Sequence, residues 1–457
     1  MLGDQIAETR AFLEHLEAHR ATLKPKLNAS HDPFMSLLPT ESASRILDLS
    51  IDQEDPLENR FPLVLASVSR RWRDIARSTP SLWTSLHLRL DEALRQPLYV
   101  DILEKWISRS AQLPLSLSIR IDYCDPCDYP RWELFKSVIT ILNIQSSRWG
   151  RLSLNIPFNL LGLFQSEIVS LVGCRFVNVL IDWKNVTCLF IVFIDVNACL
   201  EILQNAPQLR ECRLRGVDGG LYGGSNTSPI VLQHLSNFDV EIAKASVMAS
   251  TLFDRLIFPS LNSFLYSGHG RPFHQLTSFF LRSLCPIKFL YINEGRYIGH
   301  TNNLYALLRA IPTIEDLRIE DTLLFDQFFA RLSLPNASDE ASKERIFLPH
   351  LTSLYVRNPE GETSLSWSVV CNALDARSLY KRVGDGRPVL QHFYMEIRVS
   401  EGKEEYRIDK SSLEVLQRVI DRGVHVHLFN CYNNGASPDM IAYSRAYHET
   451  ERQSIGT

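Results

Sequence analysis

The 457-residue sequence has no apolar run long enough to cross a membrane and only a small excess of negative charge. Its longest apolar stretch, Val186 to Val196, covers about eleven residues, whereas a membrane-spanning helix needs about twenty. The formal net charge of -4 gives no electrostatic reason to expect nucleic acid or an anionic membrane as a partner. Residues 1–10 are polar and acidic, which does not predict a secretory signal. We therefore expect a protein of the cytoplasm, the nucleus or both.

The sequence also lacks the motifs of common catalytic and metal sites. Two glycine pairs between residues 219 and 224 are followed by neither Lys-Ser/Thr nor a helix pattern, so they do not predict a phosphate-binding loop. Cys124 and Cys127 form one C-x-x-C without a second pair at zinc spacing, which favours reduced thiols over a metal site. His425 and His427 share one face of a predicted strand without a third ligand. These absences predict a non-catalytic protein with no metal and no cofactor.

The sequence does contain a compact helical pattern between residues 38 and 83. Pro39 suits the first turn of a helix, where its missing N–H is no loss, and Ile46 and Leu49 follow at helical spacing. The whole segment predicts three short helices. A charged, proline-broken turn precedes a second helical pattern, which begins at Phe61 and ends at Thr79-Pro80-Ser81. The buried face of that helix is expected to hold Leu65, Val68, Trp72, Ile75 and Ala76. About fifty residues bury too little surface to be stable alone, so we expect a partner or a neighbouring domain.

The order of motifs in this segment resembles an F-box. The motifs are Leu-Pro-x-Glu from Leu38, Ile46-Leu47, Val-x-Arg-x-Trp-Arg-x-Ile-Ala from Val68, and Leu82-Trp83. The resemblance implies a docking domain that binds a Skp-type adaptor and, through it, a cullin-RING ligase. Carried over by position, it implies adaptor contacts at Leu38, Pro39, Ile46, Leu47, Leu65 and Val68. It also implies a mostly internal place, in the F-box core, for Trp72, Ile75 and Trp83. Ser42 departs from the pattern, since the family usually has Ile or Leu there, and this lowers the expected affinity.

Before this segment, residues 4–27 predict a helix with an irregular heptad seam. The apolar seam residues are Ile6, Leu13, Leu16, Leu23 and Leu27. Thr9 and Arg20 interrupt the seam. The interruptions favour a helix that packs on its own domain over a stable coiled-coil dimer.

After residue 84 the sequence alternates short strand patterns with amphipathic helix patterns. The strand pattern is apolar-x-x-apolar-x-apolar, and its middle copies lie about 23 to 27 residues apart, which is the period of leucine-rich repeats. The copies begin at Trp149, Val186, Leu209, Leu235, Leu261, Ile287, Ile314, Leu351 and Leu390. Irregular strands are expected at 86–88, 115–119 and 423–429. Helices are expected at 132–144, 196–206, 273–284, 304–311, 365–379 and 413–421.

This alternation predicts an α/β fold, with a short all-helical F-box followed by a leucine-rich repeat-like α/β solenoid, or horseshoe, whose strands line the concave face. The second part is similar to the leucine-rich repeat partner of fungal F-box proteins. The expected domains are an N-terminal helix at 1–33, the F-box at 34–90, the solenoid at 91–435 and a C-terminal tail at 436–457. The segments 216–224 and 335–345 are candidate binding loops, with disorder as the open alternative.

A candidate target-binding site follows from the alternation of side chains along each strand. The residue between the last two pattern positions should point away from the helices. On consecutive predicted strands these positions hold Tyr291, Arg318, Tyr355 and Tyr394, and Arg357 lies beside them. Exposed aromatic residues with arginine between them are typical of binding hot spots, so we predict a site for an unknown target protein. Alternatively, these side chains stack on one another, or lie beneath the C-terminal segment, and only stabilise the sheet.

Together these features imply a substrate-recruiting F-box subunit of a Skp, cullin and F-box type ubiquitin ligase. Such a subunit is not catalytic and works by holding a target beside the enzyme. The other interpretation is a leucine-rich repeat scaffold or inhibitor-like binding protein without a role in ubiquitin transfer. Binding of a Skp-type adaptor separates the two.

Overall fold

The computed structural model of the protein describes most of the chain. The described residues are 2–31, 38–50, 61–90, 98–120, 129–155, 183–219, 228–242, 252–268, 273–293, 302–320, 326–333, 347–358, 366–380, 389–398, 407–431 and 439–455. The chain divides into two compact units, unit 1 (Met1–Ile181) and unit 2 (Asp182–Thr457). Among the described residues, no helix combines the length and the apolar character that crossing a membrane requires.

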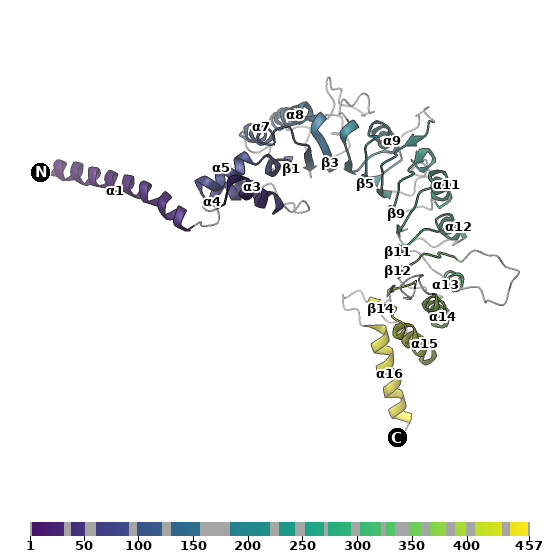
Figure 1. The fold of residues 1–457 in the computed structure, drawn as a ribbon. Coiled ribbons are helices and arrows are strands. Elements are labelled where there is room, and N and C mark those ends of the chain that lie inside the picture. Colours follow the sequence, from purple (N-terminus) through teal and green to yellow (C-terminus); the bar gives the residue numbers. More distant parts are fainter. Residues whose placement is uncertain are drawn as a thin grey trace. The chain divides into compact units, whose positions relative to one another are not determined.

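Unit 1 begins with helices and continues with alternating strands and helices (Figure 1). The helical part comprises α1 (Leu2–His31), α3 (Thr40–Leu49), α4 (Phe61–Val68), α5 (Arg70–Ser78) and the 3-10 helix η2 (Pro80–Trp83). The alternating part comprises β1 (Ser85–Arg89), α7 (Tyr99–Arg109), β2 (Leu115–Arg120), α8 (Tyr129–Ile144), η3 (Ser146–Arg148) and β3 (Trp149–Asn155). β2 pairs in parallel with both β1 and β3. β1 therefore belongs with the strands that follow it, although the sequence placed residues up to 90 in the F-box.

The helix predicted to begin at Phe61 and end at Thr79-Pro80-Ser81 is wrong in being continuous, because it is interrupted at Ser69. Ser69 has an extended backbone, and its hydroxyl accepts a hydrogen bond from the backbone N–H of Trp72 at 3.2 Å. A serine in this position is a preferred helix N-cap. The apolar spacing continues across the break, so periodicity alone does not reveal that α4 and α5 are separate helices.

The side chains of α1 contradict the expectation that this helix packs on its own domain. Every residue from 8 to 24 is exposed. The exposed fractions of the seam residues Leu13, Leu16 and Leu23 are 54%, 47% and 50%, and that of Phe12 is 61%. The apolar side of the helix is therefore not covered by the described part of the chain.

Unit 2 continues the alternation of strands and helices. Its first elements are η5 (Trp183–Asn185), β4 (Cys188–Val192), α9 (Val196–Asn205), β5 (Glu211–Val217), β6 (Ile230–Val231), β7 (Asn237–Ile242), β8 (Leu256–Ile257), β9 (Ser263–Gly268) and α11 (Phe273–Ser283). They are followed by β10 (Phe289–Asn293), α12 (Asn302–Ala310), β11 (Asp316–Glu320), α13 (Asp326–Leu332), β12 (Ser353–Asn358), α14 (Trp367–Leu379), β13 (His392–Arg398), α15 (Lys410–Asp421), β14 (His425–Cys431) and α16 (Met440–Ile455).

The strands of unit 2 form a parallel sheet in the order β4-β5-β7-β9-β10-β11-β12-β13-β14. α9, α11, α12, α14 and α15 lie on one side of this sheet (Figure 1). We call the other side the open face. Each strand that the sequence predicts is present, which confirms the α/β alternation. The sequence did not predict α7, α13, the short pair β6 and β8, or α16, which occupies the expected C-terminal tail.

The burial of strand residues alternates as expected. On β10, Leu290 and Ile292 are fully buried on the helix side, whereas Tyr291 on the open face is half-buried. Between strands and helices lies a core rich in aromatic rings, in which Phe264 contacts the rings of Phe238, Phe279 and Phe280. Burial of this aromatic surface is the main force that holds the helices on the sheet.

Two predicted loops and the C-x-x-C motif lie partly or wholly outside the described residues. Of the segment 216–224, Gly216 belongs to β5 and has a φ of +64°, in the left-handed region that glycine tolerates. A Cβ atom there would lie 2.8 Å from Cδ1 of Phe193, so a side chain would also clash with that ring. Residues 220–224, the segment 335–345 and the pair Cys124 and Cys127 are outside the described residues.

A buried arginine on α14 donates a hydrogen bond to the end of α13. Arg377 on α14 is 2% exposed, and its Nε donates to the carbonyl oxygen of Leu332 at 2.6 Å. Its Nη1 donates to the carbonyl oxygen of Leu348 at 3.0 Å, and its Nη2 donates to that of Phe347. Leu332 ends α13, while Phe347 and Leu348 resume the described chain before β12. Arg377 thus joins α14 to the end of α13 and to the described residues that precede β12.

The N-terminus of α15 provides a stability prediction with a defined pH dependence. Oδ1 of Asp409 accepts the backbone N–H of Ser412 at 2.9 Å and the hydroxyl of Ser411 at 2.6 Å, and Oδ2 accepts the hydroxyl of Ser412 at 2.7 Å. Partial burial alone would raise the pKa of Asp409, but these hydrogen bonds outweigh it and lower the pKa. The stabilisation is therefore present above the ordinary aspartate pKa of about 4 and is lost as the pH falls through the lower value of the folded state.

Replacing Asp409 by alanine should lower the free energy of unfolding by about 1 kcal/mol at pH 7, because the helix loses its cap. The difference between variant and wild type should shrink on acidification to about pH 3, as the carboxylate of the wild type is protonated. Urea denaturation at both pH values measures this. Glu414→Ala, which removes an exposed carboxylate from the same helix, is the control and should change stability little. A difference for Asp409→Ala that is independent of pH would contradict the role of the charged cap.

Candidate interaction surfaces

The first candidate surface is the helical segment α3–α5 of unit 1. Pro39 is exposed and stands immediately before α3, and Leu38 is half-buried. Nη2 of Arg71, on α5, donates a hydrogen bond to the carbonyl oxygen of Leu38 at 3.0 Å. The Leu-Pro turn is thus held in place by α5 while the proline ring faces water.

α3 and α4 present large apolar side chains to water. On α3, Ile46 and Leu49 are 39% and 70% exposed. On α4, the exposed fractions of Leu63, Val64 and Val68 are 49%, 56% and 55%. We call these five residues the apolar patch. Exposed apolar side chains on short helices are typical of a surface that a partner protein covers.

The structure corrects two of the predicted adaptor contacts. Leu47 and Leu65 are only 3% and 7% exposed, so they belong to the core of the helical segment and are not available to a partner. The remaining predicted contacts, Leu38, Pro39, Ile46 and Val68, are half-buried or exposed. Leu49, Leu63 and Val64 are also exposed and were not among the predicted contacts. Leu49 follows Ile46 at i+3 and Val64 precedes Val68 at i−4, a spacing that places each pair on one helix face.

The residues predicted for the core of this segment are mostly internal. Ile75 is 3% exposed and Trp83 is fully buried, whereas Trp72 is half-buried. Nε1 of Trp83 donates to the carbonyl oxygen of Ala76 at 2.7 Å. The ring of Trp83 also meets the ring of Trp106, on α7, edge to face with 4.7 Å between centroids. Trp83 therefore joins the helical segment to the first helix of the alternating part.

The second candidate surface is the open face of unit 2. The strand register places Tyr291, Arg318, Tyr355 and Tyr394 directly beside one another in a single row across β10, β11, β12 and β13. Arg357 lies in the next row, between its register partners Glu320 and Glu396. The five predicted target-binding residues therefore share one face of one sheet. We call them the tyrosine–arginine strip.

Aromatic rings stack along one end of the strip. The rings of Tyr355 and Tyr394 are 10° from parallel, with 4.5 Å between their centroids. The ring of Phe429, on β14, lies 5.3 Å from that of Tyr394. All three residues are half-buried. The stacking fixes the ring orientations, and each ring keeps part of its surface in contact with water.

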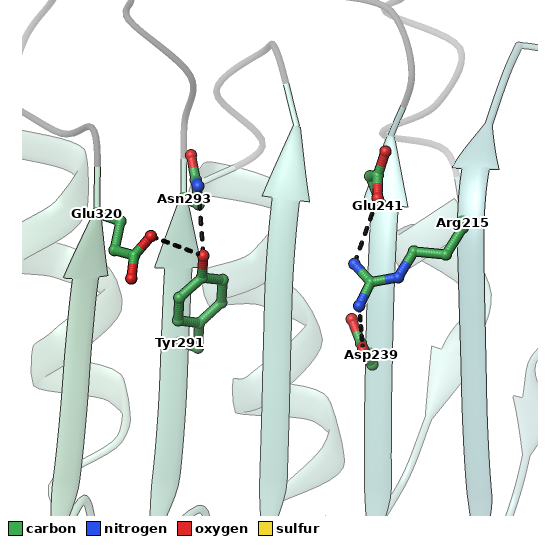
Figure 2. A network of polar contacts seen from close by, with 6 residues as sticks. All are labelled: Arg215, Asp239, Glu241, Tyr291, Asn293 and Glu320. Carbon is green, nitrogen blue, oxygen red and sulfur yellow. Dashed lines mark hydrogen bonds and ion pairs between the residues drawn. The ribbon is translucent and has the colours of Figure 1, made fainter. Parts of the chain in front are cut away.

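Charged groups link the next row of residues. Nη1 of Arg357 lies 3.4 Å from Oε2 of Glu320, and its Nε lies 3.0 Å from Oε1 of Glu396. The same Oε2 of Glu320 accepts the hydroxyl of Tyr291 at 3.1 Å, and Tyr291 in turn accepts a hydrogen bond from Asn293 (Figure 2). The network joins Tyr291 to Arg357 through one carboxylate, which the sequence did not reveal.

Burial and charge shift the pKa values in this network. Burial by itself would lower the pKa of Arg357, but the hydrogen bond and ion pair with Glu396, together with Glu320, raise it. The pKa of Tyr355 is raised, first by burial and further by the two glutamates, against the opposing effect of Arg357. The guanidinium of Arg357 therefore stays charged and the hydroxyl of Tyr355 stays protonated at neutral pH.

Arg318 differs from its neighbours in the strip because it is exposed. Its guanidinium lies 5.1 Å from the ring centroid of Phe289 and 3.4 Å from Asp316. Its Nε and Nη2 both donate to the carboxylate of Asp316, at 3.4 Å each. Of the five predicted residues, Arg318 offers the most accessible polar group.

The open face also carries an ion-pair cluster that the sequence did not suggest. On β5, Arg215 lies 2.7 Å from Asp239 and 3.3 Å from Glu241, both on β7. Figure 2 shows that β9 separates this cluster from Tyr291 and Glu320. Asp239 is 7% exposed, and burial raises its pKa despite the attraction of Arg215 and Arg213. Its register partners on the neighbouring strands are less buried, as expected for side chains on the open face. Arg213 is exposed and Leu265 is half-buried.

No model of a known protein family matches this chain, and no curated protein matches it. A relation to F-box proteins therefore stays a prediction from the motifs between Leu38 and Trp83.

Proposed function

We propose that the protein is the substrate-recruiting F-box subunit of a Skp, cullin and F-box type ubiquitin ligase. The observation that carries the proposal is the exposure of the five apolar-patch residues and of Pro39, in the segment whose motifs resemble an F-box. A helical segment that leaves five large apolar side chains in water is suited to a permanent partner. In this proposal the partner is a Skp-type adaptor, which connects the chain to a cullin-RING ligase.

The role of such a subunit is to raise the local concentration of a target protein near the ubiquitin-conjugating enzyme. The adaptor holds the F-box, and the second unit holds the target, so the target stays near the ubiquitin-conjugating enzyme. In this proposal unit 2 is a leucine-rich repeat-like horseshoe, and its open face binds the target through the tyrosine–arginine strip. The chain itself supplies no catalytic group.

Co-expression with a Skp-type adaptor tests the proposal. The adaptor should co-purify with the full chain in equal amounts, and replacement of Leu38 and Pro39 by glutamate should abolish this. Thr40→Glu, which adds one carboxylate next to the turn at the start of α3, is the control and should leave binding in place. Failure of the wild-type chain to bind any Skp-type adaptor would overturn the proposal.

A second function is favoured by Ser42, which is exposed on α3 where F-box proteins usually have Ile or Leu. A polar residue at that position lowers the expected affinity for an adaptor. The protein would then be a leucine-rich repeat scaffold or inhibitor-like binding protein without ubiquitin transfer. Ser42→Ile distinguishes the two, since it should strengthen adaptor binding in the first case and create none in the second.

In this proposal target binding depends on the tyrosine–arginine strip, so truncation of its tyrosines should weaken target binding. The double variant Tyr291→Ala and Tyr355→Ala should reduce recovery of bound target at least about tenfold, because truncated hot-spot residues typically cost more than 1 kcal/mol each. Proximity labelling in the native cell, with the variant compared against the intact chain, measures this. Tyr380→Ala is the matched control, since Tyr380 follows α14 and lies outside the strip. Unchanged labelling by a folded double variant would mean that the strip only stabilises the sheet.

A further inference from the structure

The most conspicuous uncovered surface outside the two candidate sites is α1. Residues 8 to 24 are all exposed, including the apolar side chains of Phe12, Leu13, Leu16 and Leu23. An isolated helix gains no packing energy, and single helices are only marginally stable in water. A helix of 30 residues with an apolar seam is therefore expected to be covered when the protein is in solution.

The charges of α1 are separated along its length. Residues 2–17 contain four acidic residues (Asp4, Glu8, Glu14, Glu17) and one basic residue (Arg10), a net charge of about −3. Residues 18–31 contain three basic residues (Arg20, Lys24, Lys26) and no acidic one, a net charge of about +3. Two such helices side by side repel each other when parallel and attract each other when antiparallel.

The seam has one antiparallel register that matches both its apolar and its polar positions. When Leu13 of one helix lies opposite Leu16 of the second copy, Leu16 lies opposite Leu13 in return. The same register places Thr9 opposite Arg20 of the second copy and Arg20 opposite its Thr9, so the four interrupting residues of the two helices fall in two layers instead of four. Leu23 then lies opposite position 6 of the second copy, which is an isoleucine.

The positions beside the seam agree with this register. Arg10 and Glu17 occupy the same flanking heptad position, and antiparallel helices bring such positions together across the interface. Arg10 of each copy would therefore meet Glu17 of the other. In a parallel pair the flanking neighbours would be Phe12 with Glu17 and His19 with Lys24, and neither combination is attractive.

We propose that two copies of this chain associate through α1 as an antiparallel helical pair. Leu13 and Leu16 form the centre of the interface, and Arg10 and Glu17 form ion pairs on its flank. The pair brings two copies of the α3–α5 segment and two copies of unit 2 into one assembly. This inference does not depend on the proposed function, because it concerns only residues of α1.

Sedimentation of the full chain at micromolar concentration tests whether α1 is an interface. The wild-type chain should be a dimer, and Leu16→Asp should raise the dissociation constant at least about a hundredfold, because it places a charge in the apolar centre. Ala18→Asp adds the same charge to the same helix on the side away from the seam, and it should remain a dimer. A monomeric wild-type chain, or a Leu16→Asp variant as dimeric as the wild type, would overturn the proposal.

Charge exchange tests the orientation of the two helices. Arg10→Glu and Glu17→Arg should each weaken the dimer severalfold, and the double variant should regain most of the loss. Within one helix these residues are seven positions and about 10 Å apart, so recovery reports a contact between copies. Losses that simply add in the double variant would overturn the antiparallel arrangement.

Discussion

Replacement of Arg377 by alanine is expected to lower the free energy of unfolding of unit 2 by about 3 to 5 kcal/mol. Arg377 is the hydrogen-bond donor for the carbonyl oxygens of Leu332, Phe347 and Leu348, and alanine leaves all three without it. A buried carbonyl without a donor costs about 1 to 3 kcal/mol, and the lost side-chain volume adds to this. Urea denaturation at pH 7 gives the total change.

The burial of Arg377 makes this estimate smaller than the sum of its hydrogen bonds. Removal of the guanidinium from water lowers its pKa to about 10, so the folded protein bears a cost for keeping the group charged at neutral pH. Alanine removes that cost together with the hydrogen bonds. The net loss is therefore expected to stay below what three unpaired carbonyls would cost in full.

Two further variants separate the hydrogen bonds of Arg377 from its volume. Arg377→Met keeps most of the volume and no donor, so it should lose less stability than alanine without returning to the wild-type value. Arg418→Ala removes an exposed arginine from the neighbouring α15 and should change stability by no more than about 0.5 kcal/mol. Wild-type stability of the methionine variant would show that volume, and not hydrogen bonding, is what Arg377 contributes.

The hydrogen bonds of Arg377 also predict which parts of unit 2 open first in the alanine variant. The guanidinium of Arg377 donates to Leu332, which precedes residues 334–346, and to Phe347 and Leu348, which follow them. In the alanine variant, amide hydrogen exchange should accelerate in α13 and in residues 347–350 before it does so in β10 or β11. Uniform acceleration across unit 2 would mean that these residues are held by other contacts.

The second large effect is expected at the apolar patch of the helical segment. Val64→Asp should weaken binding of a Skp-type adaptor at least about a hundredfold, because the interface would have to bury an unpaired carboxylate. Val64 is 56% exposed in the free chain, so the substitution should leave the fold of the segment intact. Calorimetric titration of the adaptor measures the affinity, and circular dichroism checks the fold.

Two comparisons make the adaptor prediction specific. Arg70→Asp places a carboxylate at the first turn of α5, where the helix dipole favours negative charge, and it should bind like the wild type. Leu65→Ala, in the core, should lower stability by about 2 to 5 kcal/mol and affect binding only through unfolding. An adaptor that binds the Val64→Asp variant with wild-type affinity would exclude the apolar patch as its docking surface.

Some parts of the fold could be predicted because they depend on neighbours in the sequence. The strand at Ile287-x-x-Leu290-x-Ile292 was recognised from its alternation, and the same alternation correctly placed Tyr291 on the open face. α14 was found with nearly its observed bounds. α13 was missed because its seven residues provide too few turns for a period of 3.6 to emerge.

Other predictions failed because the periodicity of the sequence does not determine how deeply a side chain is buried. Leu65 and Val68 fit one apolar stripe and both belong to α4, yet Leu65 is 7% exposed and Val68 is 55% exposed. Asp239 occupies an outward strand position and is nevertheless buried, since Arg215 from the adjacent strand covers it. Neither outcome can be read from spacing, which reports the direction of a side chain and not what lies above it.

By itself the sequence determined the α/β alternation, the position of each strand of the parallel sheet, and the row of Tyr291, Arg318, Tyr355 and Tyr394. These features follow from repeat periods of two, of 3.6 and of about 25 residues, which are properties of neighbouring positions. Only the tertiary structure decided that Leu47 and Leu65 are core while Leu63 and Val64 face water, that Glu320 links Tyr291 to Arg357, and that Arg377 donates to Leu332 from 45 residues away. These outcomes depend on which elements meet in space, because a buried polar group must find its partner wherever the fold brings one.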